Sequence, residues 1–151
     1  MILRWVLATA HLLALGIGLG AVWVRGRTLR STVDERELRR VFAADAWWGG
    51  AAALWIASGV WRLLAGMEKS TDYYLQNHIF LGKMGLLLGI LVLEVWPIVA
   101  LTRWRRGVAA GRSVDLRAAS ALSIISYVQA GLVVLMVFAA TAMARGIGAA
   151  R

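Results

Sequence analysis

Five ionisable side chains lie within long apolar stretches of this 151-residue chain, and their types could support chemistry: His11, Arg62, His78, Lys83 and Glu94. An ionisable group in such a stretch is costly to bury, so it usually faces other helices or a functional site. The chain has only two histidines and no cysteine. A three-histidine metal centre, a thiolate metal site and a cysteine nucleophile are therefore excluded.

If the apolar stretches are membrane-spanning helices, four of these groups lie in one leaflet. At a rise of about 1.5 Å per residue, His11 is about 10 Å and Lys83 about 9 Å from the same membrane boundary. Arg62 is roughly 6 Å deep by the same rise, and His78 is at the boundary itself. The pattern predicts that three helices bring basic and imidazole groups to a similar depth.

The helical period divides these groups between faces. At about 100° per residue, His78 and Lys83 point about 140° apart, so they cannot both point at one axis. His11 shares a stripe with Gly18, and the second apolar stretch aligns Trp55, Ser58 and Arg62. Small residues recur beside these side chains and let a helix or a flat ligand approach closely: Gly16, Gly20, Gly82, Gly85 and Gly89.

An imidazole within a helix bundle, with small residues beside it, favours a haem or porphyrin site. Neutral histidine is a common axial ligand of haem iron. In this interpretation His11 ligates the iron, Lys83 or His78 is the opposite ligand or a propionate partner, and Arg62 clamps a propionate. The chain has no CxxCH motif, so the cofactor would be haem b without covalent attachment.

The same residues also admit a structural interpretation. His11 can hydrogen-bond a neighbouring helix, and glycine stripes are ordinary packing surfaces in lipid. Lys83 and Arg62 can extend their charged ends to the membrane boundary. A structural role and a cofactor site therefore both remain open on residue chemistry alone.

Further polar residues near the apolar stretches favour contacts between helices. Glu94 is expected either to form an ion pair with Arg25 or Arg103, or to transfer protons. Asp45 is expected to be a charge near a helix N-terminus. In the last stretch Ser120, Ser123, Ser126, Tyr127 and Gln129 favour interhelical hydrogen bonds.

Four apolar segments position these side chains, over residues 5–24, 44–65, 78–101 and 118–144. Sixty per cent of the residues are hydrophobic, and each segment has the roughly 20 residues that a helix needs to cross a bilayer. Such segments must be helical, because an open strand leaves backbone groups unsatisfied in lipid. The sequence predicts an all-α, integral membrane four-helix bundle of up-down-up-down topology, formed by a single domain.

The distribution of charge predicts how this bundle is oriented. The chain has 17 Lys+Arg against 8 Asp+Glu. The connections at 25–43 and 102–117 hold most of the arginines, and the connection at 66–77 holds only Lys69. The positive-inside rule then places both termini outside the cytoplasm. The first segment, too long for a signal peptide, is expected to be retained.

Two further features of the connections follow from the same pattern. A short amphipathic helix at the membrane surface is expected in the first connection, with a cap in the stretch from Ser31 to Asp34. Because the basic residues flank apolar segments, the lipid bilayer is the expected partner, and nucleic acid is not.

The stretch from Asp45 to Arg106 resembles an uncharacterised family of bacterial four-helix membrane proteins, and the resemblance extends over nearly the whole chain. Its motifs are Trp61-Arg62, Glu68-Lys69, Tyr74, Asn77-His78, Lys83-Met84 and Glu94-x-Trp96-Pro97. That family has no assigned activity. The resemblance implies a multi-pass protein of the bacterial inner membrane.

More distantly, the chain resembles the J-type protoporphyrinogen oxidases and the copper-resistance D membrane proteins. The J-type oxidases are small helical membrane proteins that bind haem through a histidine in the first helix and a lysine at the start of a later one. His11 and Lys83 match those two positions, whereas the rest of that histidine-rich pattern is absent. The five methionines are too scattered for a copper-ligand ladder.

These observations lead to three hypotheses for function. The first is a small b-type haem-binding membrane protein, which could transfer electrons. The second is a non-catalytic accessory or scaffold subunit of a larger membrane complex or homo-oligomer. The third is a porphyrin-oxidising membrane enzyme.

Overall fold

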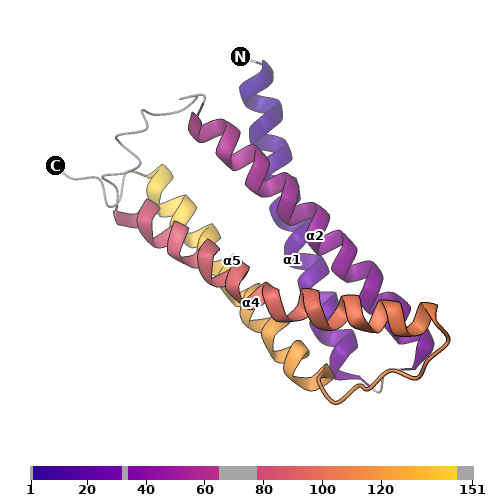
Figure 1. Cartoon of the computed structure of the whole chain (residues 1–151). Helices are drawn as coiled ribbons and strands as arrows, with labels where there is room; N and C mark the ends of the chain where they lie inside the picture. The colour runs from indigo at the N-terminus through magenta and orange to yellow at the C-terminus, as the bar shows by residue number, and fades with distance from the viewer. Residues whose placement is uncertain (1, 32–33, 65–77, 146–151) are drawn as a thin grey trace.

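The computed structural model describes residues 2–31, 34–64 and 78–145, and nearly all of these residues are helical. The four helices are α1 (Ile2–Arg30), α2 (Glu35–Leu64), α4 (His78–Ala109) and α5 (Ala119–Ala144). Successive helices run in opposite directions (Figure 1), so α1 begins and α5 ends at the same end of the bundle. The predicted all-α four-helix topology is confirmed.

The first two helices are longer than their predicted apolar segments. α1 continues to Arg30 and α2 begins at Glu35, so no separate amphipathic helix lies between them and that prediction was wrong. The arginines, leucines and glutamates of this region favour helix, and they extend α1 and α2 instead. The predicted cap is present, since Asp34 Oδ1 accepts the backbone N–H of Glu37 at 2.8 Å.

Three of the described helices, α1, α4 and α5, are long and apolar enough to cross a membrane. The apolar half of α2 is built largely from alanine, glycine and tryptophan and contains Arg62, so it is less hydrophobic than the other three. α2 packs against α1 along the bundle. A fourth span over α2 remains a prediction that rests on this packing.

The helices form two antiparallel pairs that diverge. α1 packs against α2, α4 packs against α5, and the pairs are joined chiefly through α1 and α5. Figure 1 shows the pairs separating toward the end where α1 begins. Buried residues are concentrated away from that end, in an apolar cluster that joins all four helices: Leu29, Leu38, Val41, Leu101, Trp104, Ala119 and Leu122.

α4 bends midway along its length, so its C-terminal half lies across α1 and α2 (Figure 1). Pro97 lies within the helix in this region. A proline there removes a backbone donor and clashes with the preceding turn, which kinks the helix. On the far side of the bend, Leu101 and Trp104 are buried in the apolar cluster with residues of the other three helices.

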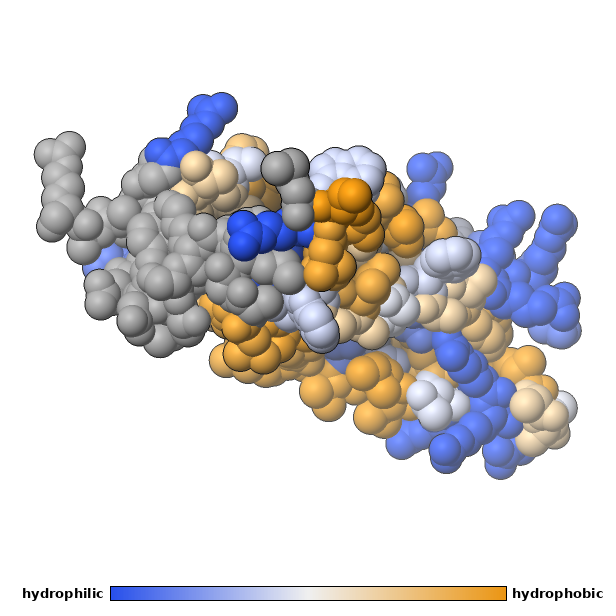
Figure 2. Space-filling model, turned by 90° about the horizontal axis from the view of Figure 1, so that it is seen from above, coloured by the Kyte–Doolittle hydropathy of each residue, from blue (hydrophilic) through white to orange (hydrophobic). Residues whose placement is uncertain are grey.

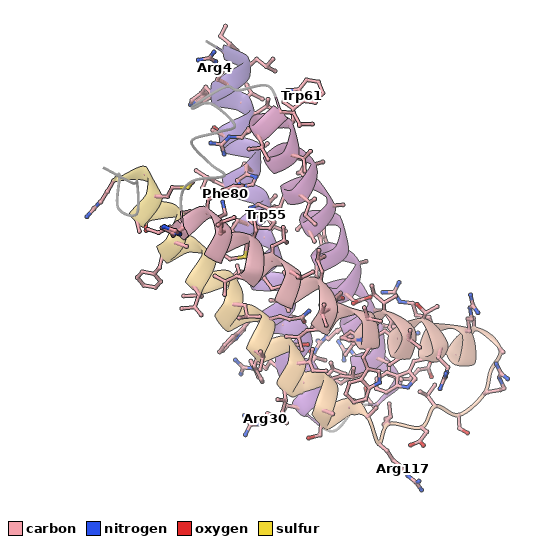
Figure 3. All side chains as sticks on the ribbon, turned by 60° about the vertical axis from the view of Figure 1, so that its left-hand side comes forward. Arg4, Arg30, Trp55, Trp61, Phe80 and Arg117 are labelled. Carbon is pink, nitrogen blue, oxygen red and sulfur yellow. The ribbon has the colours of Figure 1, made fainter. Side chains whose placement is uncertain are left out.

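Most arginines gather at the end of the bundle formed by this half of α4 and the start of α2, here called the arginine-rich end. In Figure 2 hydrophilic side chains collect on the right-hand side, whereas hydrophobic ones cover the middle of the face. Arg30 and Arg117 lie at this end, far from Arg4 (Figure 3). A surface that is apolar around the middle of the bundle and charged at one end is the surface expected of a membrane protein.

Candidate functional site

A cavity of about 150 Å³ lies between the two helix pairs, on the side where they diverge. All four helices contribute to its lining, with α2 and α4 providing most of it. Trp55 of α2 and Phe80 of α4 both face this space (Figure 3). His11, Arg62 and Lys83 line it as well, so three of the four candidate cofactor residues surround one cavity.

His11 is buried at the edge of this cavity and is held by α2. Its Nδ1 is 2.8 Å from Ser58 Oγ, and Ser58 Oγ in turn donates to the backbone carbonyl of Trp55 at 3.0 Å. A serine hydroxyl has one proton; when that proton is donated to the Trp55 carbonyl, the same oxygen accepts from His11 Nδ1–H. The neutral imidazole then carries its lone pair on Nε2, the arrangement that a metal-ligating histidine adopts.

Two neighbours fix the plane of this imidazole. The rings of His11 and Trp55 stack with centroids 5.2 Å apart and an interplanar angle of 23°. Gly59 gives the ring its space, because a Cβ at that position would be 3.2 Å from His11 Cε1. The aligned Trp55, Ser58 and Arg62 of α2 are therefore the face that meets His11 and the cavity.

Trp55 also contacts Lys83, so one indole ring lies near both the imidazole of His11 and a basic side chain of α4. Lys83 Nζ is 6.0 Å from the centroid of the Trp55 ring, within the range of a cation–π contact. Trp55 Nε1 is buried without a hydrogen-bond acceptor among the described residues. A buried donor that lacks an acceptor is costly, so an acceptor atom on a ligand at this position would stabilise the site.

His78 lies outside this arrangement. It is exposed at the start of α4, and it does not line the cavity that His11 and Lys83 share. The 140° separation between His78 and Lys83 on the helix accounts for this difference.

The chemistry of the lining residues suits a haem, whereas the present volume is small for one. An imidazole in the tautomer of a metal ligand, two basic side chains and an aromatic wall surround the space. Pockets for small-molecule ligands usually have about 300–1,000 Å³, so a macrocycle requires the two helix pairs to separate further. Among the described residues α2 packs only weakly on α4.

A second polar cluster, here called the arginine network, lies toward the arginine-rich end and centres on Arg25. The side chain of Arg25 is fully buried. Its Nη1 donates to Asp45 Oδ1 and Glu94 Oε1, each at 2.8 Å, and its Nη2 donates to Glu94 Oε2 at 3.0 Å. The bidentate geometry with Glu94 is the strong form of an arginine–carboxylate pair.

The remaining donors of Arg25 are satisfied by α5. Nη2 donates to Gln129 Oε1 at 2.6 Å, and Nε donates to Ser126 Oγ at 3.0 Å. Gln129 Nε2 donates back to Glu94 Oε2 at 2.7 Å. One guanidinium therefore connects α1 with side chains of α2, α4 and α5.

Asp45 carries the arginine network on to the bent half of α4. Its Oδ2 accepts from Arg105 Nη2 at 2.7 Å, and the same nitrogen donates to the Phe42 carbonyl at 2.9 Å. Two arginines and two carboxylates balance in charge, so the buried Arg25 is compensated by the partly buried Asp45 and Glu94, while Arg105 is exposed. The arrangement holds the bundle together rather than presenting a reactive group.

The outcomes for the polar residues outside the cavity are mixed. The predicted ion pair between Glu94 and Arg25 is confirmed. Asp45 was expected near a helix N-terminus, and this was wrong, because α2 begins ten residues earlier and Asp45 lies inside it. The predicted interhelical hydrogen bonds are confirmed for three residues: Ser123 donates to the Gly26 carbonyl, and Ser126 and Gln129 accept from Arg25.

A comparison with protein families shows to which family this chain is related. The predicted membrane protein family DUF2214 matches residues 3–148. The chain belongs to this family. No curated protein and no solved structure matches it.

Within this DUF2214 protein, the described residues contain no group of three or more histidine, aspartate or glutamate side chains that could hold a metal ion. The more distant resemblance to J-type oxidases is untested by the family match and stays a prediction.

Sequence reasoning named Arg25 as one possible partner of Glu94, but it did not recognise this residue as the centre of the arginine network. Arg25 was counted among the arginines of the first connection, although it lies on α1. The sequence contained a signal that Arg25 lies on the same helix face as His11, because His11, Gly18 and Arg25 follow one another at intervals of seven residues. The stripe that buries His11 and Gly18 thus continues to Arg25, and all three are buried.

Proposed function

We propose that this protein binds haem b at the cavity between the two helix pairs, with His11 as an axial ligand of the iron. The observation that carries the proposal is the hydrogen bond from His11 Nδ1 to Ser58. When Nδ1 carries the proton of this bond, Nε2 is the nitrogen of the neutral ring that can ligate a metal. The proposal concerns a binding site, and electron transfer would be its simplest use.

The other lining residues support the same ligand. Lys83 and Arg62 are the basic groups that would pair with propionates. The indole of Trp55 holds the plane of His11 and offers a buried N–H to an acceptor. When bound, the haem would supply a one-electron redox centre, and the chain would supply its ligand, its counter-charges and its apolar surroundings.

The test is an optical spectrum of the detergent-purified protein, oxidised and then reduced with dithionite, after expression in haem-replete cells. We expect a Soret band and a reducible α-band. His11→Ala should abolish both bands and leave the protein inserted in the membrane. Gly16→Ala is the matched control, because it changes an exposed α1 position with nothing within 4 Å.

An unchanged spectrum in His11→Ala would remove His11 from the iron. A featureless spectrum of the parent protein, also after hemin is added, would contradict the proposal. It would favour a non-catalytic accessory subunit of a larger membrane complex, whose partners co-purification would then identify. A porphyrin-oxidising enzyme would require in addition quinone-dependent turnover of a porphyrinogen.

We also propose that the arginine-rich end faces the cytoplasm of a bacterial inner membrane and that both termini lie outside. Support comes from the positive-inside rule. The chain has no cysteine, so single cysteines report their own side without further changes. In intact cells an impermeant maleimide should label Arg145→Cys and leave Ser113→Cys unlabelled, and the reverse pattern would overturn the orientation.

A further inference from the structure

A second cavity, of about 530 Å³, lies at the arginine-rich end, where the bent half of α4 meets the connection to α5. Its volume is within the roughly 300–1,000 Å³ of small-molecule sites. The wall from α4 includes Trp96, Val99, Arg103 and Trp104. The other wall is the chain segment 112–118.

The segment that forms this second wall has a defined conformation. Gly111 has a φ of +64°, and the N–H of Arg112 donates to the Gly107 carbonyl at 3.0 Å. The N–H of Gly111 donates to the Val108 carbonyl at 3.0 Å. These bonds form a Schellman motif that ends α4 and turns the chain back. The turn brings Arg112 to the cavity.

The charged lining of this cavity is predominantly basic. Arg103, Arg112 and Arg117 line it together with one carboxylate, Asp115. Asp115 Oδ1 accepts the backbone N–H of Arg117 at 3.0 Å and lies 3.8 Å from Arg117 Nε. That carboxylate therefore shapes the loop and offsets only part of the positive charge. The three arginines are exposed, so their guanidinium groups can close on an anion.

The lining of the same cavity that comes from α4 before Arg103 is apolar. Trp96 and Val99 are about half exposed, at 47% and 51%, and lie within the candidate membrane-spanning helix α4, before Arg103. Trp104 is buried behind them. Apolar and aromatic surface thus leads from the span to a group of arginines, which is the order of polarity in a phospholipid at the membrane interface.

We propose that this cavity is a binding site for an anionic phospholipid. Arg103, Arg112 and Arg117 would hold the phosphate, and an acyl chain would lie along Trp96 and Val99. Three arginines favour an anionic headgroup over a zwitterionic one, because a choline would meet a positive field. The site is separate from the haem proposal, since it shares no residue with the His11 cavity.

The experiment compares the thermal stability of the detergent-purified protein with added phosphatidylglycerol, phosphatidylcholine or inorganic phosphate. A ligand that binds only the folded protein raises its unfolding temperature. Phosphatidylglycerol should raise it, and the other two should not. In the variant R103Q/R112Q/R117Q the lipid concentration for a half-maximal shift should rise about tenfold or more, as expected for lost charge-assisted bonds.

The matched control is R27Q/R30Q/R36Q, which removes the same charge from exposed arginines near the same end but outside the cavity. It should keep the parent response to phosphatidylglycerol. An equal loss of the phosphatidylglycerol response in both triple variants would show that the lipid is attracted to the arginine-rich end as a whole, and it would overturn the proposed site. An equal shift with inorganic phosphate would overturn the assignment to a lipid, as would an equal shift with phosphatidylcholine.

Discussion

His11 and Arg25 lie on one buried face of α1, and each is held by side chains from other helices. They are about 21 Å apart along the helix axis, at a rise of 1.5 Å per residue. The His11 end borders a cavity that opens between helix pairs. At the other end, Arg25 forms hydrogen bonds with side chains of the three other described helices. The same face of α1 thus contains both a candidate ligand and the strongest connection of the bundle.

Arg25→Ala should destabilise the protein by about 3–5 kcal/mol, because it leaves the partly buried Glu94 without its cation and Asp45 with Arg105 alone. The measurement is thermal or denaturant unfolding in detergent. Arg27→Ala is the control, since Arg27 is exposed on the same helix, and it should change stability by no more than about 0.5 kcal/mol. Equal effects of the two substitutions would contradict the central place of Arg25.

Arg25 and Glu94 should show strong energetic coupling. Glu94→Gln keeps the shape of the side chain but removes the charge that the guanidinium meets in a bidentate pair. In a double-mutant cycle with Arg25→Gln, the coupling free energy should be about 0.5–3 kcal/mol. Additive effects would mean that the pair contributes no stability beyond that of its separate residues.

Gly26→Ala should destabilise the contact between α1 and α5, whereas Gly20→Ala should not. A Cβ on Gly26 would be 3.1 Å from Ser126 Cβ, while one on Gly20 has nothing within 4 Å. Overpacking costs about 1–3 kcal/mol, and alanine in an open helical position gains up to about 1 kcal/mol over glycine. The free energy of unfolding of both variants, measured in one detergent, tests this prediction. It should fall below that of the parent protein in Gly26→Ala and should not fall in Gly20→Ala.

Ser58→Ala should weaken haem binding without unfolding the bundle, if His11 ligates iron as proposed. The substitution removes the group that orients His11 Nδ1, and losing such a partner typically lowers metal affinity 10–100-fold, or roughly 1.4–2.8 kcal/mol. Hemin titration followed at the Soret band measures it. Ser58→Thr keeps a hydroxyl and is the control; equal affinity of all three proteins would exclude this role of Ser58.

Lys83→Ala should lower hemin affinity or shift the reduced spectrum, because its ammonium group lines the same cavity as His11 and contacts the same Trp55 ring. His78→Ala should change neither, since His78 does not line the cavity. Reduced-minus-oxidised spectra of the two variants distinguish them. A spectral change in His78→Ala alone would reverse the assignment of the second polar partner.

The fold class could be predicted because length and hydropathy decide it before any packing detail matters. The ends of the helices could not, because the segment around Arg27 and Arg36 is both charged and helix-forming, and charge alone suggested a connection. The glycine pattern was also ambiguous. A Cβ would meet nothing within 4 Å at Gly16, Gly20, Gly82 and Gly85, whereas Gly18 and Gly26 make the close helix contacts.

The candidate site was partly predictable for a related reason. Depth along each helix follows from counting residues, so His11, Arg62 and Lys83 could be placed at one level. Which of them meet depends on how the helices rotate, and only the angle between His78 and Lys83 could be estimated in advance. The full set of contacts of Arg25 required tertiary information, because its four polar neighbours come from three other helices far apart in sequence.

The uneven distribution of buried contacts has a consequence for amide hydrogen exchange. Beyond Ser58 on α2 and Met136 on α5, no described residue of either helix is buried, whereas the arginine-rich half contains most of the core. Local opening requires less free energy where fewer contacts are lost. Backbone amides should therefore exchange progressively faster along each helix toward the cavity of His11, and the slowest should surround Arg25.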